Sequence, residues 1–182
     1  AYIKNSNGDR VVDFQKSNLH VMGYSVPVSE TMSLAELLPR LYSLPEHPEW
    51  IPQRASYYKP NWGFSIAHND LIRLAEDRYE VRIDSTLSNG AMTYGECVIP
   101  GEQADEILFS THICHPSLCN DNLSGIVIAA YLAKAIAAMP KRRYTYRFLF
   151  VPAQLGSLAW LARNQEAYGR IRHGVVLVAL GD

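Results

Sequence analysis

In the second half of the chain, short apolar runs alternate with longer amphipathic stretches. The runs are of strand length and the stretches are of helix length. We expect strands at 106–111, 144–151 and 174–180, and helices at 124–139, which Pro140 ends, and at 156–168. Strands that alternate with helices through short connections indicate a sheet covered by helices.

The first half has a different pattern, with frequent turn formers, many aromatic residues and short strand patterns, including 79–83 and 95–99. Asn7-Gly8 lies between two apolar runs and favours a hairpin, because both residues tolerate positive φ. A helix is expected at 33–42, since Ser33 can cap it and Glu36 can complete a capping box. We therefore predict a small β-rich domain at 1–103 and a partial α/β domain at 104–182.

Composition and charge exclude some classes of partner. The 182 residues carry 17 basic and 18 acidic side chains, a formal net charge of −1, so there is no basic excess to neutralise nucleic-acid phosphates. Apolar runs stay well below the ~20 residues that span a bilayer, and the first residues lack a signal-peptide layout. We expect a cytoplasmic protein without nucleic-acid or membrane partners, with a homo-oligomer left open.

The termini raise a separate question. The sequence starts without methionine and stops at Gly181-Asp182, directly after an apolar run. A strand at the edge of a complete domain seldom stops in this way. We expect that the sequence is a segment of a longer protein.

The loop between the first strand and the first helix of the second half carries the candidate chemistry. Functional loops of such sheets follow the carboxyl ends of the strands. This loop contains two histidines, two cysteines and one aspartate: His112, Cys114, His115, Cys119 and Asp121. Imidazole and carboxylate groups suit zinc, so the sequence favours a metal site here.

Other interpretations of these residues stay open. Cys114 and Cys119 fit better as buried apolar side chains, the usual state of a free cysteine, and Cys97 has a structural role. His112 could instead be a core histidine and Asp121 a helix cap. A structural zinc site of two histidines and two cysteines is too cramped for the usual ligand spacing, and a cysteine nucleophile beside His115 has little support.

The segment Asp121-Asn122-Leu123-Ser124-Gly125, after a strand that ends at His112, resembles the co-catalytic zinc aminopeptidases. The chain is more closely similar to the aminopeptidase-like domain associated with bacterial polysaccharide-biosynthesis loci. The similar segments are 16–20, 24–28, 57–59, 62–64 and 110–117. This resemblance implies a three-layer α/β fold, a sheet with helices on both faces, and a zinc hydrolase that acts on peptide or amide bonds.

The resemblance also implies a metal-ligand set. His112 matches the histidine that binds one zinc ion, and Asp121 matches the carboxylate that bridges two ions. Asp182 stands at the strand end where the family has another aspartate ligand. His115 is a second candidate for the histidine role. The family's last histidine ligand would lie beyond Asp182.

The chain departs from the family pattern after the strand at 144–151. The family has one or two glutamates before a Gly-Ser pair, whereas this chain has Ala153 and Gln154 before Gly156-Ser157. Neither side chain can act as a general base, and loss of that group costs ~10²–10⁴-fold in rate. We expect an incomplete or inactive hydrolase.

The aromatic residues of the first half support a binding module as the alternative function. Aromatic rings can stack on sugars or peptides, although aromatic residues more often fill a core. The candidates are Trp50, Tyr57, Tyr58, Trp62 and Phe64. Ligand binding that survives chelation would distinguish this module from a zinc hydrolase.

Overall fold

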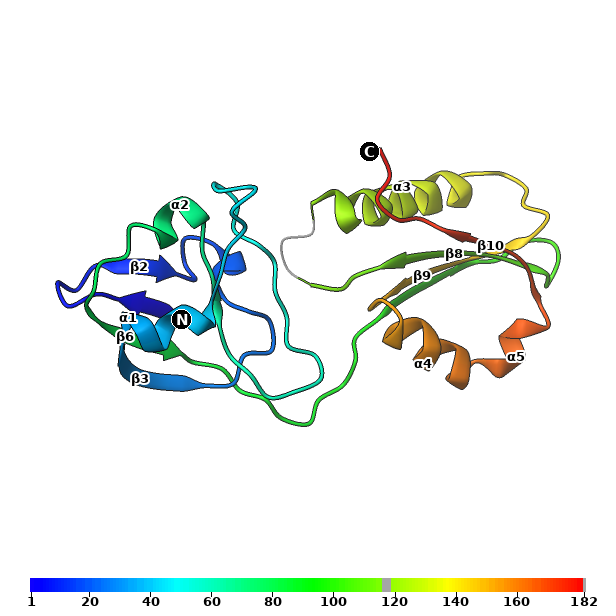
Figure 1. Cartoon of the computed structure of the whole chain (residues 1–182). Coiled ribbons are helices and arrows are strands. Elements are labelled where there is room, and N and C mark those ends of the chain that lie inside the picture. The colour runs from blue at the N-terminus through cyan, green and yellow to red at the C-terminus, as the bar shows by residue number, and fades with distance from the viewer. Residues whose placement is uncertain (116–118, 182) are drawn as a thin grey trace. The chain divides into compact units, whose positions relative to one another are not determined.

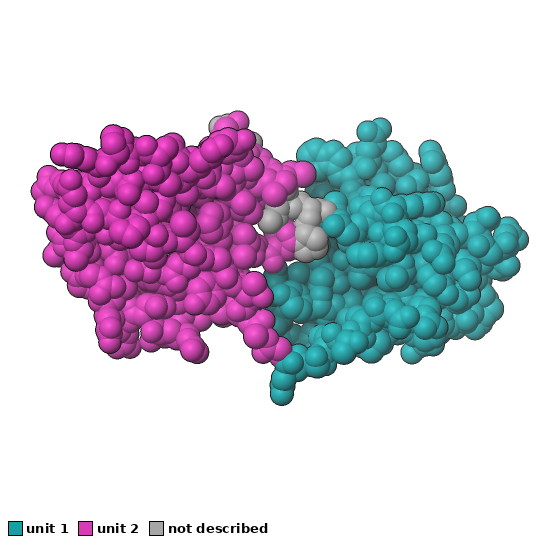
Figure 2. Space-filling view, turned by 180° about the vertical axis from the view of Figure 1, so that it is seen from behind, with its two compact units in different colours: residues 1–89 teal, residues 90–182 magenta. Residues whose placement is uncertain are grey.

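The computed structural model describes residues 1–115 and 119–181, which form two compact units, Ala1–Asn89 and Gly90–Asp182 (Figure 2). The sequence predicted a boundary at 103/104. The chain divides earlier because strand β7 (Gly95–Ile99) pairs with β9 (Thr145–Val151) and so belongs to the sheet of unit 2.

Unit 1 (Ala1–Asn89) is built on an antiparallel sheet with strand order β2-β1-β6-β3 (Figure 1). The strands β4 and β5 form a separate, small parallel pair. Its strands are β1 (Tyr2–Lys4), β2 (Arg10–Asp13), β3 (Val28–Ser33), β4 (Leu41–Tyr42), β5 (Phe64–Ser65) and β6 (Arg78–Ile83). Its helical segments are η1 (Asn18–His20), α1 (Leu34–Leu37), η2 (Leu38–Arg40) and α2 (His68–Leu71). The predicted hairpin around Asn7-Gly8 is confirmed as β1–β2.

The core of unit 1 takes up part of the aromatic set. Phe64 is fully buried beside Ile3, Tyr79 and Val81, and Trp62 packs against the same cluster. Phe64 therefore fills the interior, whereas Trp62 is only partly buried and has the Arg40 guanidinium 4.8 Å from the centre of its ring.

Unit 2 (Gly90–Asp182) contains a four-stranded sheet with order β10-β8-β9-β7, in which only β7 is antiparallel to its neighbour. Its remaining strands are β8 (Glu106–His112) and β10 (Ile171–Val176). Its helical segments are the irregular turn η3 (Asn120–Ser124), α3 (Gly125–Ala137), α4 (Leu155–Arg163) and α5 (Gln165–Tyr168). The predicted alternation of strands and helices is confirmed.

Helices cover both faces of this sheet (Figure 1). Phe148 of β9 packs with Ala129 of α3, whereas the next residue, Leu149, packs with Trp160 of α4. Successive strand residues point to opposite faces, so α3 and α4 must lie on opposite sides. No helix in the described parts of the chain has the length and apolar character needed to cross a membrane.

Three predicted elements differ most from the structure in their bounds. The capping box of Ser33 and Glu36 is present, but α1 ends at Leu37 and Pro39 lies in the 3-10 turn η2 that follows. The helix predicted at 156–168 breaks at Asn164, whose side chain donates to the Trp160 carbonyl (2.8 Å). The strand predicted at 174–180 starts and ends earlier, as β10.

Candidate functional site

Three parallel strands bring their carboxyl ends to one edge of the sheet. His112, the last residue of β8, pairs in register with Val151, the last residue of β9. On the other side of β8, Val176 lies opposite Ser110, and the Leu177 amide donates to the Ser110 carbonyl (2.9 Å). The segments that follow the three strands therefore start side by side, where functional loops of such sheets are found.

His112 and Asp121 meet at this edge. The Nε2 atom of His112 lies 2.8 Å from Oδ1 of Asp121, and their side chains are 18% and 64% exposed. Asp121 lies in η3, where its backbone and that of Asn122 are non-helical, and the peptide bond between these two residues is cis. An imidazole nitrogen and a carboxylate oxygen, both ordinary zinc ligands, thus converge at a place that solvent can reach.

Asn122 is fully buried and joins three segments around this pair. Its Nδ2 donates to Thr111 Oγ1 (2.7 Å) and to the His112 carbonyl (3.1 Å), and its Oδ1 accepts from the Ala179 amide (3.2 Å). Thr111 Oγ1 in turn donates to the Leu177 carbonyl (2.9 Å). These bonds hold the turn that carries Asp121 against the end of β8. Sequence reasoning did not single out Asn122, although an amide directly after a candidate ligand was a usable signal.

Ser124 and Gly125 complete the turn. Ser124 Oγ donates to the Asn120 carbonyl (2.7 Å) and accepts from the Leu180 amide (2.9 Å). A Cβ atom at Gly125 would lie only 2.3 Å from the Leu177 carbonyl oxygen, so the close approach requires glycine. The motif is thus built to fix the direction of the residues before α3.

The turn after β9 lies beside the segment after β8. The Ala153 amide donates to Cys114 Sγ (3.1 Å), and the Ile113 amide donates to the Val151 carbonyl (2.9 Å). Ala153 and Gln154 are both exposed. The resemblance implies a carboxylate at this turn. The chain instead presents the methyl group of Ala153 and the amide of Gln154, near the sheet edge that carries His112.

The cysteine prediction is wrong. Cys114 and Cys119 were expected to be buried, yet both are exposed, as is Cys97. Cys114 and Cys119 lie in the connection between β8 and η3, outside the packed elements, and Cys97 lies in the edge strand β7.

The structure brings together two of the four predicted metal ligands. Across residues 1–115 and 119–181, no three side chains of His, Cys, Asp or Glu gather closely enough to hold a metal ion. His115 is half-buried in the segment after β8 and does not form such a group with His112 and Asp121. Asp182 lies outside the described residues.

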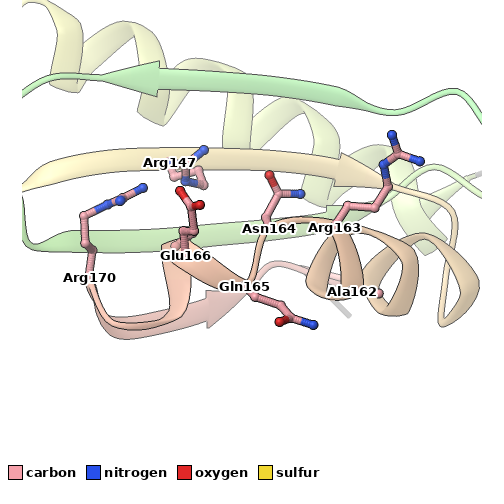
Figure 3. Close-up of a pocket in the computed structure, with 8 residues that line it drawn as sticks. Arg147, Ala162, Arg163, Asn164, Gln165, Glu166 and Arg170 are labelled. Carbon is pink, nitrogen blue, oxygen red and sulfur yellow. The ribbon is translucent and has the colours of Figure 1, made fainter.

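A pocket of about 460 Å³ lies elsewhere in unit 2, between β9 and the helices α4 and α5 (Figure 3). Its lining is mostly polar and consists of Arg147, Ala162, Arg163, Asn164, Gln165, Glu166, Ala167 and Arg170. None of the predicted metal ligands lines it, so the pocket is separate from the candidate site.

Two arginines of this pocket, Arg147 and Arg170, hold a buried carboxylate. Glu106 is 3% exposed and accepts from Arg147 Nε (2.6 Å) and Arg170 Nε (2.8 Å), while Arg147 also pairs with Glu96. The hydrogen bonds from Arg147, with those from Arg170, lower the pKa of Glu106 below its ordinary value, although burial acts in the opposite direction. These charges are paired within the fold, which indicates a structural role.

Three tyrosines of unit 1 form an exposed group. Tyr24, Tyr57 and Tyr58 are 62%, 60% and 94% exposed. The ring centroids of Tyr24 and Tyr57 lie 5.3 Å apart, and those of Tyr57 and Tyr58 lie 6.3 Å apart. Trp50 is also exposed and stacks on His47 with centroids 4.0 Å apart. Of the predicted aromatic set, only Trp50, Tyr57 and Tyr58 are thus largely exposed.

Comparisons with known proteins give a curated sequence and a crystal structure, both from Clostridium acetobutylicum. A curated relative named "Putative polysaccharide biosynthesis protein with aminopeptidase-like domain" is 50% identical over 182 residues, which are all of this chain and 42% of the relative. A crystal structure of a protein named "putative peptidase" is also 50% identical and matches with a TM-score of 0.97 over all of this chain and 43% of that chain. The chain therefore spans less than half the length of these relatives.

A family profile covers nearly the whole chain, over residues 6–182. The match includes all of unit 2, unit 1 from residue 6 onward and every residue of the candidate site. The chain therefore belongs to the family described as "Domain of unknown function (DUF4910)".

Proposed function

We propose that unit 2 is a peptidase-like hydrolase domain that binds zinc through His112 and Asp121, with Asp182 as a further ligand and His115 as the alternative histidine. The contact of 2.8 Å between His112 Nε2 and Asp121 Oδ1 carries the proposal. Relatives named as aminopeptidase-like and as a peptidase support the same class of reaction, hydrolysis of a peptide or amide bond.

The donor atoms fit a zinc ion. Zinc takes imidazole nitrogen and carboxylate oxygen as ligands. The hydrogen bond between His112 Nε2 and Asp121 Oδ1 contains a proton, and a zinc ion that binds both atoms would replace it. Asp121 is 64% exposed at its side chain, so its carboxylate has room to reach a second cation. Asn122 would fix the orientation of Asp121, because its amide is held on three sides.

The chemistry of the bound metal would be to lower the pKa of a water molecule and to polarise the scissile carbonyl group. The residues of this chain would supply the ligands and the orientation, but not a general base at the turn after β9. Ala153 has no titratable group, and Gln154 cannot take up a proton. We therefore expect little zinc-dependent turnover of aminoacyl amides by this chain. Robust turnover would contradict the statement that the chain lacks a general base at this turn.

Zinc binding is the direct test. After incubation with zinc and removal of free metal, mass spectrometry should detect bound zinc, and the substitution Asp121→Asn should weaken binding about tenfold or more, because it removes a charged ligand. Competition with a zinc-sensitive dye gives the affinities.

The control is Asp84→Asn, which removes an exposed carboxylate of unit 1 that pairs with Arg82. This variant should bind zinc as the unaltered chain does. Less than about a tenth of an equivalent of zinc per chain would refute the proposal, because structural and catalytic sites bind their metal far more tightly.

The exposed tyrosines support a second candidate, a sugar- or peptide-binding surface on unit 1. Rings at 5.3 and 6.3 Å spacing present apolar faces with a polar edge, as stacking surfaces for sugars do. Calorimetric titration with oligosaccharides distinguishes the two functions. Binding that survives chelation and Asp121→Asn but is lost in Tyr58→Ala would favour this candidate.

A further inference from the structure

The pocket between β9 and the helices α4 and α5 contains two charged side chains that the fold does not use. Arg163 and Glu166 both line it. Within residues 1–115 and 119–181, neither side chain forms an ion pair or a hydrogen bond. Two opposite charges thus border one cavity without neutralising each other.

The other two arginines of the pocket differ in how fully the fold engages them. Arg147 bonds to both Glu96 and Glu106, so its charge is compensated. Arg170 donates its Nε–H to Glu106 (2.8 Å), while its two Nη groups make no hydrogen bond to the described residues. The buried Glu106 therefore fixes the Arg170 side chain and leaves its outer N–H groups available. Arg163 and Arg170 form the cationic side of the pocket.

The break between α4 and α5 gives the pocket a fixed wall. The Asn164 side chain donates from Nδ2 to the Trp160 carbonyl (2.8 Å), and its Oδ1 accepts from no described residue. The Ala167 amide donates to the Asn164 carbonyl (2.9 Å), and Ala167 is buried with Trp160 in one cluster. A ligand that meets such a wall finds its partners already oriented, which lowers the entropic cost of binding.

Figure 3 shows how the polar groups are arranged in this view. Glu166 and Asn164 stand between the two arginines of the cationic side, and their side chains turn toward β9. Gln165 points away from the pocket. The carboxylate of Glu166 and the free oxygen of Asn164 are therefore the acceptors of the pocket, and the guanidinium groups are its donors.

This set of groups selects for a ligand that carries both charges. A guanidinium group binds a carboxylate through paired hydrogen bonds, and carboxylate and amide oxygens accept from an ammonium group. Glu166 opposes a simple anion, and the arginines oppose a simple cation. A free α-amino acid has both groups on one carbon atom, and a pocket of about 460 Å³ leaves room for its side chain.

We propose that this pocket binds a free α-amino acid, with the carboxylate at Arg163 and Arg170 and the ammonium group at Glu166 and Asn164. The site is separate from His112 and the other predicted metal ligands. The proposal therefore rests neither on zinc nor on the proposed hydrolase function.

A titration of the metal-free, ¹⁵N-labelled 182-residue chain with L-alanine tests the proposal by NMR in the presence of a chelator. L-alanine suffices as the probe because the proposed contacts involve only the α-ammonium and α-carboxylate groups. The amides of 163–167 should shift saturably, with a dissociation constant on the order of 1 mM. L-alaninamide lacks the carboxylate and N-acetyl-L-alanine lacks the ammonium group, so each should bind about tenfold more weakly or worse.

Substitutions assign the binding to the pocket. Arg163→Gln and Glu166→Gln should each weaken L-alanine binding about tenfold, because each removes one charged partner. In Glu166→Gln, N-acetyl-L-alanine should bind as tightly as L-alanine. The matched controls are Arg73→Gln and Glu102→Gln, at exposed side chains outside the pocket, and they should bind L-alanine as the unaltered chain does. Thermal unfolding should be the same in all four variants, since Arg163 and Glu166 hold no contact of the fold.

Three results would overturn the proposal. One is the absence of saturable shifts at 163–167 at about 10 mM L-alanine, where a site of the expected affinity would be mostly occupied. Another is binding of N-acetyl-L-alanine or inorganic phosphate as tight as that of L-alanine, because the pocket would then select only an anion. The third is L-alanine binding that both Arg163→Gln and Glu166→Gln leave unchanged.

Discussion

Gly125→Ala is expected to lower the free energy of unfolding of unit 2 by about 2–3 kcal/mol, at the upper end of the range for overpacking. The added Cβ atom would lie 2.3 Å from the Leu177 carbonyl oxygen, 2.5 Å from Asn122 Oδ1 and 2.7 Å from Thr111 Oγ1. Relief requires the start of α3 to move away, which would break the hydrogen bonds of the Asn122 amide. Urea unfolding followed by circular dichroism measures the loss, and hydrogen exchange of β8 assigns it to unit 2.

The matched control is Gly169→Ala. Gly169 follows α5 with φ −63°, and a Cβ atom there would meet nothing within 4 Å. Alanine should therefore be tolerated, with a change within about 0.5 kcal/mol or a slight gain. Equal stabilities of the two variants would show that the turn before α3 adapts more easily than its contacts indicate.

The Gly125→Ala variant should also bind zinc more weakly, because Asp121 would lose its fixed orientation.

Glu106→Gln is expected to destabilise unit 2 by about 3 kcal/mol at neutral pH. The change removes the negative charge that Arg147 and Arg170 share, and breaking a buried ion pair leaves a desolvated charge without its full partner. Glu96 still pairs with Arg147, which keeps the cost at the lower end of the usual range. Thermal and urea unfolding give the difference, and Glu102→Gln, at an exposed carboxylate, should change stability by less than about 0.5 kcal/mol.

The pH dependence of this effect has a defined sign. The arginines lower the pKa of Glu106 in the folded state below its unfolded value, so the carboxylate stabilises the fold above the ordinary glutamate pKa. That contribution is lost as the pH falls through the lowered pKa. The stability difference between the unaltered chain and Glu106→Gln should therefore shrink below about pH 4.3. A difference that stays constant from pH 7 to pH 3 would contradict this role of Glu106.

Local sequence signals predicted much of the fold. Asn7-Gly8 identified the β1–β2 hairpin, and Ser33 with Glu36 identified the start of α1, because each signal acts within a few residues. The end of α1 was mispredicted, since Leu38–Arg40 form a tighter turn that leads into β4. Side-chain competition at Asn164 likewise divided a predicted helix.

The candidate site was predictable only where its signals are close in sequence. His112 and Asp121 were found because one ends a strand and the other precedes a helix. The amide of Asn122 contacts residues more than fifty positions away, and no periodic pattern records such a contact. The bounds of β10 were missed for the same reason, since Ala179 and Leu180 donate to Asn122 and Ser124 rather than to the sheet.

Asn122 links the turn after β8 to the segment after β10, which lies 57 residues further along the chain. The geometry at His112 and Asp121 is therefore complete only after β10 has docked on β8, a step that closes a long loop and carries its entropic cost. A metal that needs this geometry binds the docked state and draws the folding equilibrium toward it. Under the proposed function, zinc uptake would report the population of correctly assembled molecules, not merely the presence of the ligand side chains.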